Sequence, residues 1–180
     1  MMRRLQPPRH VNQQGAILVV SLMMLLLLTI IGITAMNTVT MEERMAGNLR
    51  DSNLAFQGAE AALRDGEGTL EALTLEPTLC SSAPCKIWNE DVLTFYLEDQ
   101  PASWWVSNAV EYGVDGTHEL VSNNSDPRWF NEFLEFSRDS LTVGHGVTTG
   151  RSFFRVTARS EGGSDTALSV LQSTFVKRLN

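Results

Sequence analysis

Two cysteines are the residues of this chain whose type and spacing best suit a specific chemistry. Cys80 and Cys85 are the only cysteines, and four residues separate them in CSSAPC. One pair without a neighbouring histidine makes a poor metal site, and redox-active pairs usually have two intervening residues. In an oxidising compartment, two cysteines this close around a turn favour a structural disulfide that fixes local shape. We therefore predict a disulfide between Cys80 and Cys85.

The other reactive side chains form no recognisable catalytic or metal-binding pattern. Three histidines have no cysteine nearby: His10, His118 and His145. Four acids lie close together in the sequence: Glu90, Asp91, Glu98 and Asp99. They lack the alternating oxygen ligands of a calcium loop, so we favour a solvated acidic face over a calcium site. The chain has no Gly-x-Ser-x-Gly, Walker or His-Glu-x-x-His motif. We expect no enzyme activity, no cofactor and no bound metal.

These side chains must be positioned by a chain that is organised around one apolar stretch. Positions 15–36 hold 22 residues without an ionisable side chain. As a helix, this stretch spans roughly 30 Å, the thickness of the hydrocarbon core of a bilayer. Each of its Leu, Ile and Val residues favours membrane insertion by about 0.3–0.6 kcal/mol. Residues 16–36 are therefore predicted to form a transmembrane helix.

The residues that flank the apolar stretch predict its orientation. Arg3, Arg4 and Arg9 precede it without any acidic residue, and by the positive-inside rule such a flank stays in the cytoplasm. The rest of the chain would then lie outside the inner membrane. A secretory signal has a shorter apolar core followed by a small-residue cleavage site. Residues 33–35 form only a poor version of that site, so we expect the helix to remain in the mature protein.

The junction between the basic flank and the apolar stretch carries a resemblance to a known signal. A short basic leader ends in Gly15, Ala16 follows, and the apolar stretch begins at once. This resembles the prepilin signal of type IV pilins and type II secretion pseudopilins. The resemblance implies that prepilin peptidase removes residues 1–15 by cleavage between Gly15 and Ala16, and that Ala16 is then N-methylated. Cleavage before the apolar stretch would keep the helix in the mature protein.

One position departs from the wider pilin pattern. Major pilins have a glutamate as the fifth residue of the mature chain, which pairs with the N-terminal amine of a neighbouring subunit; here this residue is Val20. An acid within a membrane segment costs up to about 3 kcal/mol, and a subunit with nothing above it would find no amine to pair with. K-type minor pseudopilins of type II secretion share this loss. We favour a position at or near the tip; the alternative is that valine only improves membrane retention.

The segment after the apolar stretch continues the helical pattern. A stripe with a period near 3.6 residues could lie against a globular domain: Met41, Met45, Leu49, Phe56, Ala59 and Leu63, with Ser52 in the one gap. The phrase MEERMAGNLRDSNLAFQGAEAALR resembles the N-terminal region of PilX-type minor pilins, and the resemblance runs from Gly15 to Arg64. Gly66 and Gly68 should end the helix. Residues 16–65 are thus expected to form the long N-terminal helix, and residues 66–180 the head.

Two segments predict the first part of the head. Five aromatic residues between Ile87 and Tyr112 indicate core packing rather than a binding surface: Trp88, Phe95, Tyr96, Trp104 and Trp105. Pro101 should open a short helix that ends at Gly113.

The last third of the chain predicts a sheet. Residues 126–136 have apolar pairs that also suit a helix, but in relatives a Pro-Arg-aromatic phrase leads into a strand, so we favour a strand. Residues 151–160 alternate apolar and polar side chains, and with residues 166–178 they predict a hairpin. The hairpin resembles the last two strands of PilX-type proteins. The expected fold is therefore the α+β pilin fold, one long N-terminal helix packed on an antiparallel β-sheet head.

The resemblance implies a structural role. A PilX-type minor pilin would help to initiate type IV pilus assembly and support adhesion and twitching motility. Its partners would be prepilin peptidase, the inner membrane and, through the N-terminal helix, other minor pilins and the major pilin. It would reside in the inner membrane before assembly and in the pilus at the cell surface afterwards.

The net charge argues against one kind of partner, and two other protein classes are alternatives to this interpretation. The formal charge of −7 becomes −10 when the three arginines of the leader are removed, so nucleic acid is not an expected partner. The first alternative is a K-type minor pseudopilin of type II secretion, although the large helical insertion of that type is absent. The second is a membrane-anchored periplasmic binding module with a pilin-like start.

Overall fold

A computed structural model describes residues 15–83, 85–89, 93, 97–113, 120–139 and 150–179, with Glu98 described by its backbone alone. Its contacts divide the chain into two compact units, Met1–Ala46 and Gly47–Asn180. The first unit consists, in its described part, of helix and Gly15. The second holds the rest of that helix and the head.

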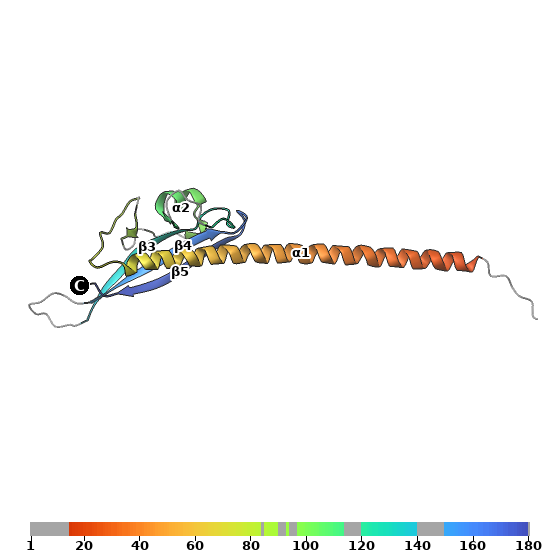
Figure 1. Cartoon of the computed structure of the whole chain (residues 1–180), viewed down its shortest axis with the longest axis horizontal. Helices are drawn as coiled ribbons and strands as arrows, with labels where there is room; N and C mark the ends of the chain where they lie inside the picture. Colours follow the sequence, from red (N-terminus) through yellow and green to blue (C-terminus); the bar gives the residue numbers. More distant parts are fainter. Residues whose placement is uncertain are drawn as a thin grey trace, which may run out of the picture. The chain divides into compact units, whose positions relative to one another are not determined.

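Helix α1 spans Ala16–Glu71 and contributes to both units (Figure 1). The predicted end at Gly66 is wrong, because Gly66 faces the sheet instead of closing the helix. A Cβ at this position would lie 2.6 Å from Cγ1 of Val156. The last turn is held by Leu70, which is fully buried. Lys177 completes it, since its Nζ donates to the carbonyls of Leu70 (3.0 Å) and Glu71 at the end of the helix.

The described strands form one sheet in the head. They are β1 (Ile87–Trp88), β2 (Val110–Glu111), β3 (Arg128–Arg138), β4 (Gly150–Glu161) and β5 (Leu168–Lys177). The order is β1-β3-β4-β5, and β2 also pairs with β3. β1 runs parallel to β3, and the other pairs are antiparallel. The α+β pilin fold is confirmed, with a mixed sheet in which antiparallel pairs dominate.

The predicted strands of the last third are also confirmed. In the ambiguous segment 126–136, β3 starts two residues after the predicted start and runs two residues beyond the predicted end. It pairs with β4 through a register shift between Phe133 and Glu135. The hairpin of β4 and β5 pairs ten residues of each strand without a shift. The period-two pattern predicted this hairpin because one face of each strand packs on α1.

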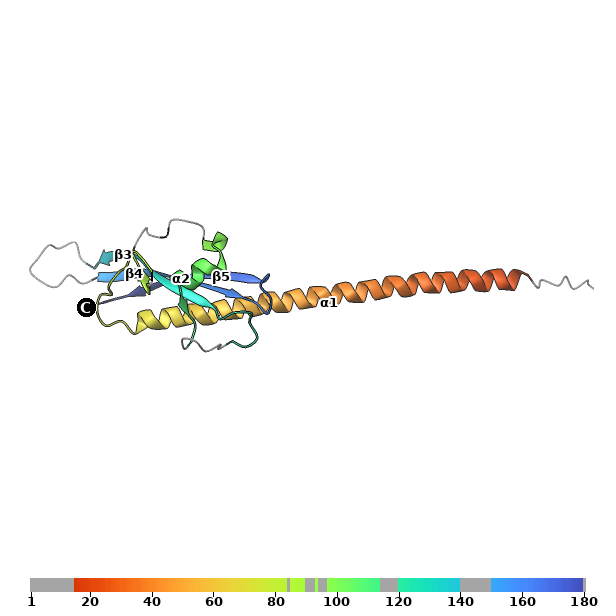
Figure 2. The same cartoon turned by 90° about the horizontal axis from the view of Figure 1, so that it is seen from above.

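The core lies on both faces of the sheet. On one face, Leu70 of α1 packs with Phe154 and Val156. On the other, Trp105 of α2 (Ala102–Asn108) packs against Phe130. Figures 1 and 2 show α2 next to β3 and β4. Each sheet face is therefore covered by a helix over β3 and β4.

The aromatic prediction is confirmed where the structure describes it. Trp105 is fully buried and Trp88 nearly so, whereas Phe95 and Tyr96 lie outside the described residues. The short helix follows Pro101 as predicted but ends at Asn108, five residues before Gly113. It ends early because residues 110–111 pair with β3 as β2. Gly113 has a φ of 82°, which glycine adopts readily, in the turn that follows.

Candidate functional site

The predicted processing site lies at the start of α1. Ala16 is the first residue of the helix, and Gly15 directly precedes it. Both residues are exposed, and nothing lies within 4 Å of a Cβ built on Gly15. The basic residues Arg3, Arg4 and Arg9 lie outside the described residues. The two residues that flank the predicted cleavage bond are thus exposed in the part of the chain that the structure describes.

The helix surface that follows is apolar and uncovered. Its large apolar side chains are between 51% (Ile30) and 74% (Ile17) exposed, and Val20 is 57% exposed. α1 is long and apolar enough to cross a membrane. A continuous apolar surface of this size is far larger than a soluble monomer exposes to water. It therefore needs lipid or other helices around it.

The hydroxyl groups within the apolar segment are satisfied by the helix itself. Ser21, Thr29 and Thr34 donate to the carbonyl oxygens of Leu18 (2.9 Å), Leu26 (2.8 Å) and Ile31 (2.9 Å). Such bonds remove the cost of an unpaired hydroxyl in a bilayer or in a packed fibre. Isolated Ser and Thr residues in the apolar sequence could have indicated such bonds. The bonds themselves are defined only by the helix, which brings each hydroxyl close to a carbonyl three residues earlier.

Only part of the predicted apolar stripe packs against the head. Within the unit that holds the head, Leu49 and Phe56 are 65% and 48% exposed, so the prediction is wrong for these two residues. Met41 and Met45 are 64% and 61% exposed and belong to the other unit. Ala59 is buried and Leu63 packs against the core. The face that packs on the sheet consists mostly of small residues: Ala55, Gly58, Ala59, Ala62, Gly66 and Leu70. Small residues occupy this face of the helix because they let it approach the strands closely.

Two glycines define how close that approach is. A Cβ at Gly58 would lie 2.3 Å from Oγ of Ser160 and 2.6 Å from Nδ2 of Asn123, and Gly66 meets Val156 in the same way. The two glycines are eight residues apart and so lie on one helix face. This spacing, with alanines between, is the signal that could have located the contact face in the sequence.

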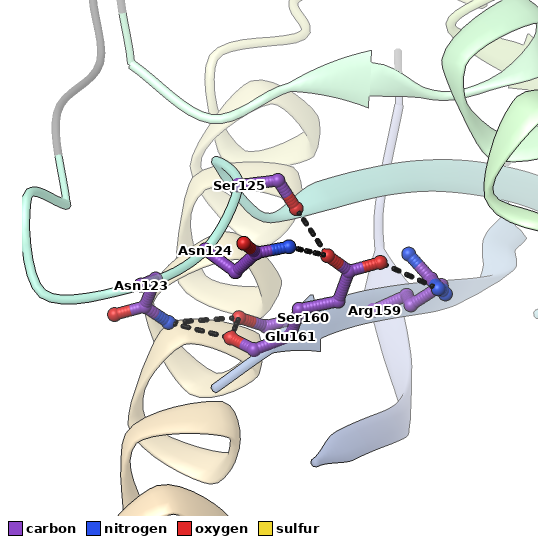
Figure 3. Close-up of polar contacts among 6 residues, drawn as sticks. All are labelled: Asn123, Asn124, Ser125, Arg159, Ser160 and Glu161. Atoms are coloured by element: carbon purple, nitrogen blue, oxygen red, sulfur yellow. Dashed lines mark hydrogen bonds and ion pairs between the residues drawn. The ribbon is translucent and has the colours of Figure 1, made fainter. Parts of the chain in front are cut away.

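Asn123 joins three segments of the head around Gly58. Its Nδ2 donates to Oγ of Ser160 (3.1 Å) and to the backbone oxygen of Glu161 (2.8 Å) (Figure 3). It also donates to the backbone oxygen of Leu54 in α1 (3.3 Å). Asn123 itself is buried. One amide thus ties the loop before β3 and the end of β4 to the helix. Its role was not predictable from the sequence, because an Asn in a loop-like segment carries no pattern.

Glu161 is the buried acid of this cluster. Its carboxylate accepts hydrogen bonds from Nδ2 of Asn124 (2.8 Å), Oγ of Ser125 (3.0 Å) and the guanidinium of Arg159 (3.0 Å) (Figure 3). Burial by itself raises the pKa of Glu161, but these three bonds and the charge of Arg159 outweigh it, and the pKa lies below its ordinary value. The carboxylate is therefore held in its ionised form.

Further polar contacts tie the remaining turns of α1 to the head. The carboxylate of Asp51 accepts from the backbone N–H of Ser164 (3.0 Å) and from its hydroxyl. The hydroxyl bond and the backbone bonds lower the pKa of Asp51. Near the other end, Nε1 of Trp129 donates to Asp65 (2.8 Å), and Nδ2 of Asn131 donates to the carbonyl of Gly66 (3.2 Å). The head is thus fixed to α1 over about five helical turns from residue 51.

The disulfide prediction is confirmed. Cys80 and Cys85 are joined, with their Cα atoms 6.1 Å apart. The backbone N–H of Cys80 donates to the carbonyl of Ile87 (3.2 Å), and that of Asn89 donates to the carbonyl of Cys80 (3.0 Å). The crosslink therefore holds the connecting segment beside β1.

The described residues offer no metal site. No three His, Cys, Asp or Glu side chains lie close enough together in that part of the chain to hold an ion. Of the acids considered for calcium, Asp99 is exposed, whereas Glu90, Asp91 and the side chain of Glu98 lie outside the described residues. The three histidines, His10, His118 and His145, lie outside them too. The expected absence of metal and cofactor stays a prediction.

Comparison with known proteins decides the family. Residues 14–64 match the PilX N-terminal family, and residues 50–177 match the family described as type IV pilus assembly protein PilX, C-terminal region. The chain belongs to the PilX family. No curated protein and no solved structure matches it.

Membership of the PilX family gives the protein a general role. This PilX-type chain is a minor pilin, a structural component of the type IV pilus that takes part in assembly with other pilins. Its apolar helix anchors it in a membrane and associates it with the pilus. The two matches overlap within α1, where the small-residue face joins helix and head.

Proposed function

We propose that this minor pilin is cleaved between Gly15 and Ala16, N-methylated on Ala16, and used to initiate type IV pilus assembly at or near the pilus tip. The observation that carries the proposal is the uncovered apolar surface of α1, which starts at the first residue after Gly15. A leader removed at this bond leaves that surface intact at the new N-terminus.

The same helix surface serves two environments in turn. Before assembly, residues 16–36 lie in the inner membrane with the arginine-rich leader in the cytoplasm. During assembly, the helix leaves lipid and packs against the N-terminal helices of other minor pilins and of the major pilin. Exposing even one large apolar side chain to water costs about 1.5–3 kcal/mol, so the helix passes directly from lipid to the fibre.

Val20 supports the position at the tip. In a fibre with subunits above, an acid at this position could pair with the amine of a neighbour. At Val20 the helix presents only an apolar, 57% exposed side chain. A subunit with no neighbour above it gains nothing from an acid and avoids the cost of an unpaired charge.

Replacing Val20 tests this position. V20E should reduce the number of pili per cell several-fold and shrink the twitching zone and surface adhesion in proportion, because the new carboxylate finds no amine. V20Q is the matched control, because glutamine has the size of glutamate without its charge. Cells with V20Q should retain most pili. Counting sheared pili decides the matter, and full piliation with V20E would contradict the tip position.

A further inference from the structure

We propose that Glu132 makes the pairing of β1 with the sheet sensitive to pH. A protonated carboxyl group keeps β1 closed on β3, and an ionised one raises the population of a state in which β1 has separated from β3. The proposal rests on the burial of this side chain, on a missing hydrogen bond and on the shortness of β1. It concerns the head alone and depends neither on leader cleavage nor on the position in the pilus.

Glu132 is a buried acid with a carboxylate oxygen that lacks a hydrogen bond. It lies in β3 beside Trp88 of β1 and Arg155 of β4, and its side chain is only 6% exposed. Within the described residues, its Oε2 accepts no hydrogen bond. Nη1 of Arg155 lies 3.8 Å from this oxygen, which is too far for a hydrogen bond. An ionised carboxylate in this place is therefore only weakly compensated for its lost hydration.

Glu161 shows what a fully bonded buried acid looks like in the same sheet. Its carboxylate accepts three hydrogen bonds, and its pKa lies below the ordinary value. At Glu132 burial raises the pKa, and the charge of Arg155 opposes this only in part. The two acids thus respond to pH in opposite directions.

The elements around Glu132 offer it little further compensation in the part of the chain that the structure describes. Arg155 is itself 42% exposed, so water screens its charge. Trp88 supplies no bond, because its Nε1 is also buried without a partner there. α2 contains no charged residue, and Arg159 of β4 is bound to Glu161. The charged residues before β1 and in the turn η1 (Leu97–Asp99) are exposed: Lys86 and Asp99.

β1 is the neighbour of Glu132 that separates from β3 most easily. It pairs with β3 at two positions, whereas β4 pairs with β3 at ten. The Cys80–Cys85 crosslink and the backbone bonds of Cys80 join β1 to the chain before it, so residues 80–89 form one crosslinked segment, called the disulfide segment below. Separation breaks few bonds and lets water reach the carboxylate. Because it also exposes the buried Ile87 and Trp88, the open state remains a minor one.

The direction of the pH dependence follows from the burial of Glu132. The closed state binds the proton more tightly than the open state, because only the closed state keeps the carboxyl group from water. Closure is therefore most favoured below the ordinary pKa of a glutamic acid, about 4.3. It weakens as the pH rises through the raised pKa of the closed state.

Amide hydrogen exchange of the full-length protein in detergent tests the proposal, with E132Q as the comparison. Glutamine has the size of a protonated glutamic acid and cannot ionise. The amides of Cys80 and Asn89, which bond within the disulfide segment, should exchange at least about fivefold faster in the wild type than in E132Q at pH 8. This ratio should fall to about one by pH 4. Because both proteins are compared at the same pH, the intrinsic exchange rate and the titration of Glu161 cancel.

Two further variants separate this effect from a general loss of stability. E135Q removes an exposed acid from the same strand and should exchange like the wild type. R155Q removes the charge beside Glu132, so it should speed exchange of the disulfide segment at pH 8 in the wild type but not in E132Q. The amides of β5 should exchange equally in the wild type and E132Q.

Four results would overturn the proposal. They are a ratio of one at pH 8, a ratio that does not change with pH, an equal change in the amides of β5, and an effect of R155Q that is the same with and without Glu132.

Discussion

Gly66 shows at the scale of one residue how α1 is joined to the sheet. Alanine is favoured over glycine within a helix by about 1 kcal/mol. At Gly66, however, a Cβ would lie 2.6 Å from Cγ1 of Val156 and 3.1 Å from Cε3 of Trp129. Overpacking a core costs about 1–3 kcal/mol, so we expect G66A to lower the free energy of unfolding by up to about 2 kcal/mol. Urea unfolding of the full-length protein in detergent measures this.

Gly68 provides the matched control in the same helix. A Cβ there would meet nothing within 4 Å, so G68A should keep the helix-propensity gain and stabilise the protein by up to about 1 kcal/mol. If both variants shift stability in the same direction, close packing at Gly66 is not what selects glycine.

Glu161 makes stability depend on pH. Its pKa is lower in the folded protein than in the unfolded chain, so its bonds stabilise the fold above the unfolded pKa of about 4.3 and are lost as the pH falls through the folded pKa. E161Q should lower the free energy of unfolding at pH 7 by about 1–3 kcal/mol, the usual effect of losing hydrogen bonds to a charged group.

The same variant supplies its own check at low pH. The difference between wild type and E161Q should shrink steadily below about pH 4.3, since the wild-type carboxyl then becomes neutral as well. Thermal unfolding at a series of pH values measures it. A difference that stays constant from pH 7 to pH 3 would show that the charge of Glu161 is not the source of the stability.

At the scale of elements, the exposed stripe on α1 separates folding from assembly. Leu49 and Phe56 belong to the head unit but are 65% and 48% exposed. L49A and F56A should change the free energy of unfolding by no more than about 0.5 kcal/mol. In the proposed function α1 packs against other pilin helices, so both variants should nevertheless lower the amount of this protein in sheared pili, because each removes an exposed apolar side chain of that helix. Wild-type levels in pili would show that the stripe faces solvent.

The elements also show how far sequence reasoning reaches. The start of α1, the disulfide and the β4–β5 hairpin were predictable, because hydrophobic length, cysteine spacing and period-two alternation are local signals. The contact face of α1 was predicted wrongly. Large apolar residues suggested that they were buried, whereas the close approach of helix and sheet buries Gly58 and Gly66 instead. Apart from the bond between Arg159 and Glu161, the roles of Asn123 and Glu161 depend on partners at least 36 residues away in the chain, and no local pattern encodes them.

At the scale of the whole molecule, the N-terminus links the membrane-anchored subunit to the pilus. Membership of the PilX family identifies the chain as a minor pilin. Its exposed apolar helix suits both lipid and the interior of a fibre. That helix can begin the mature protein only if the basic leader is removed at Gly15. In the proposed function, processing at this bond is the step that connects the anchored subunit with the assembled one.

The intact mass of the protein, purified from cells with and without prepilin peptidase, tests this claim most directly. With the peptidase, the account predicts a chain that has lost residues 1–15 and gained one methyl group on Ala16. Without it, the chain should keep its leader and remain in the membrane. A full-length, unmethylated protein in cells that contain the active peptidase would contradict the account.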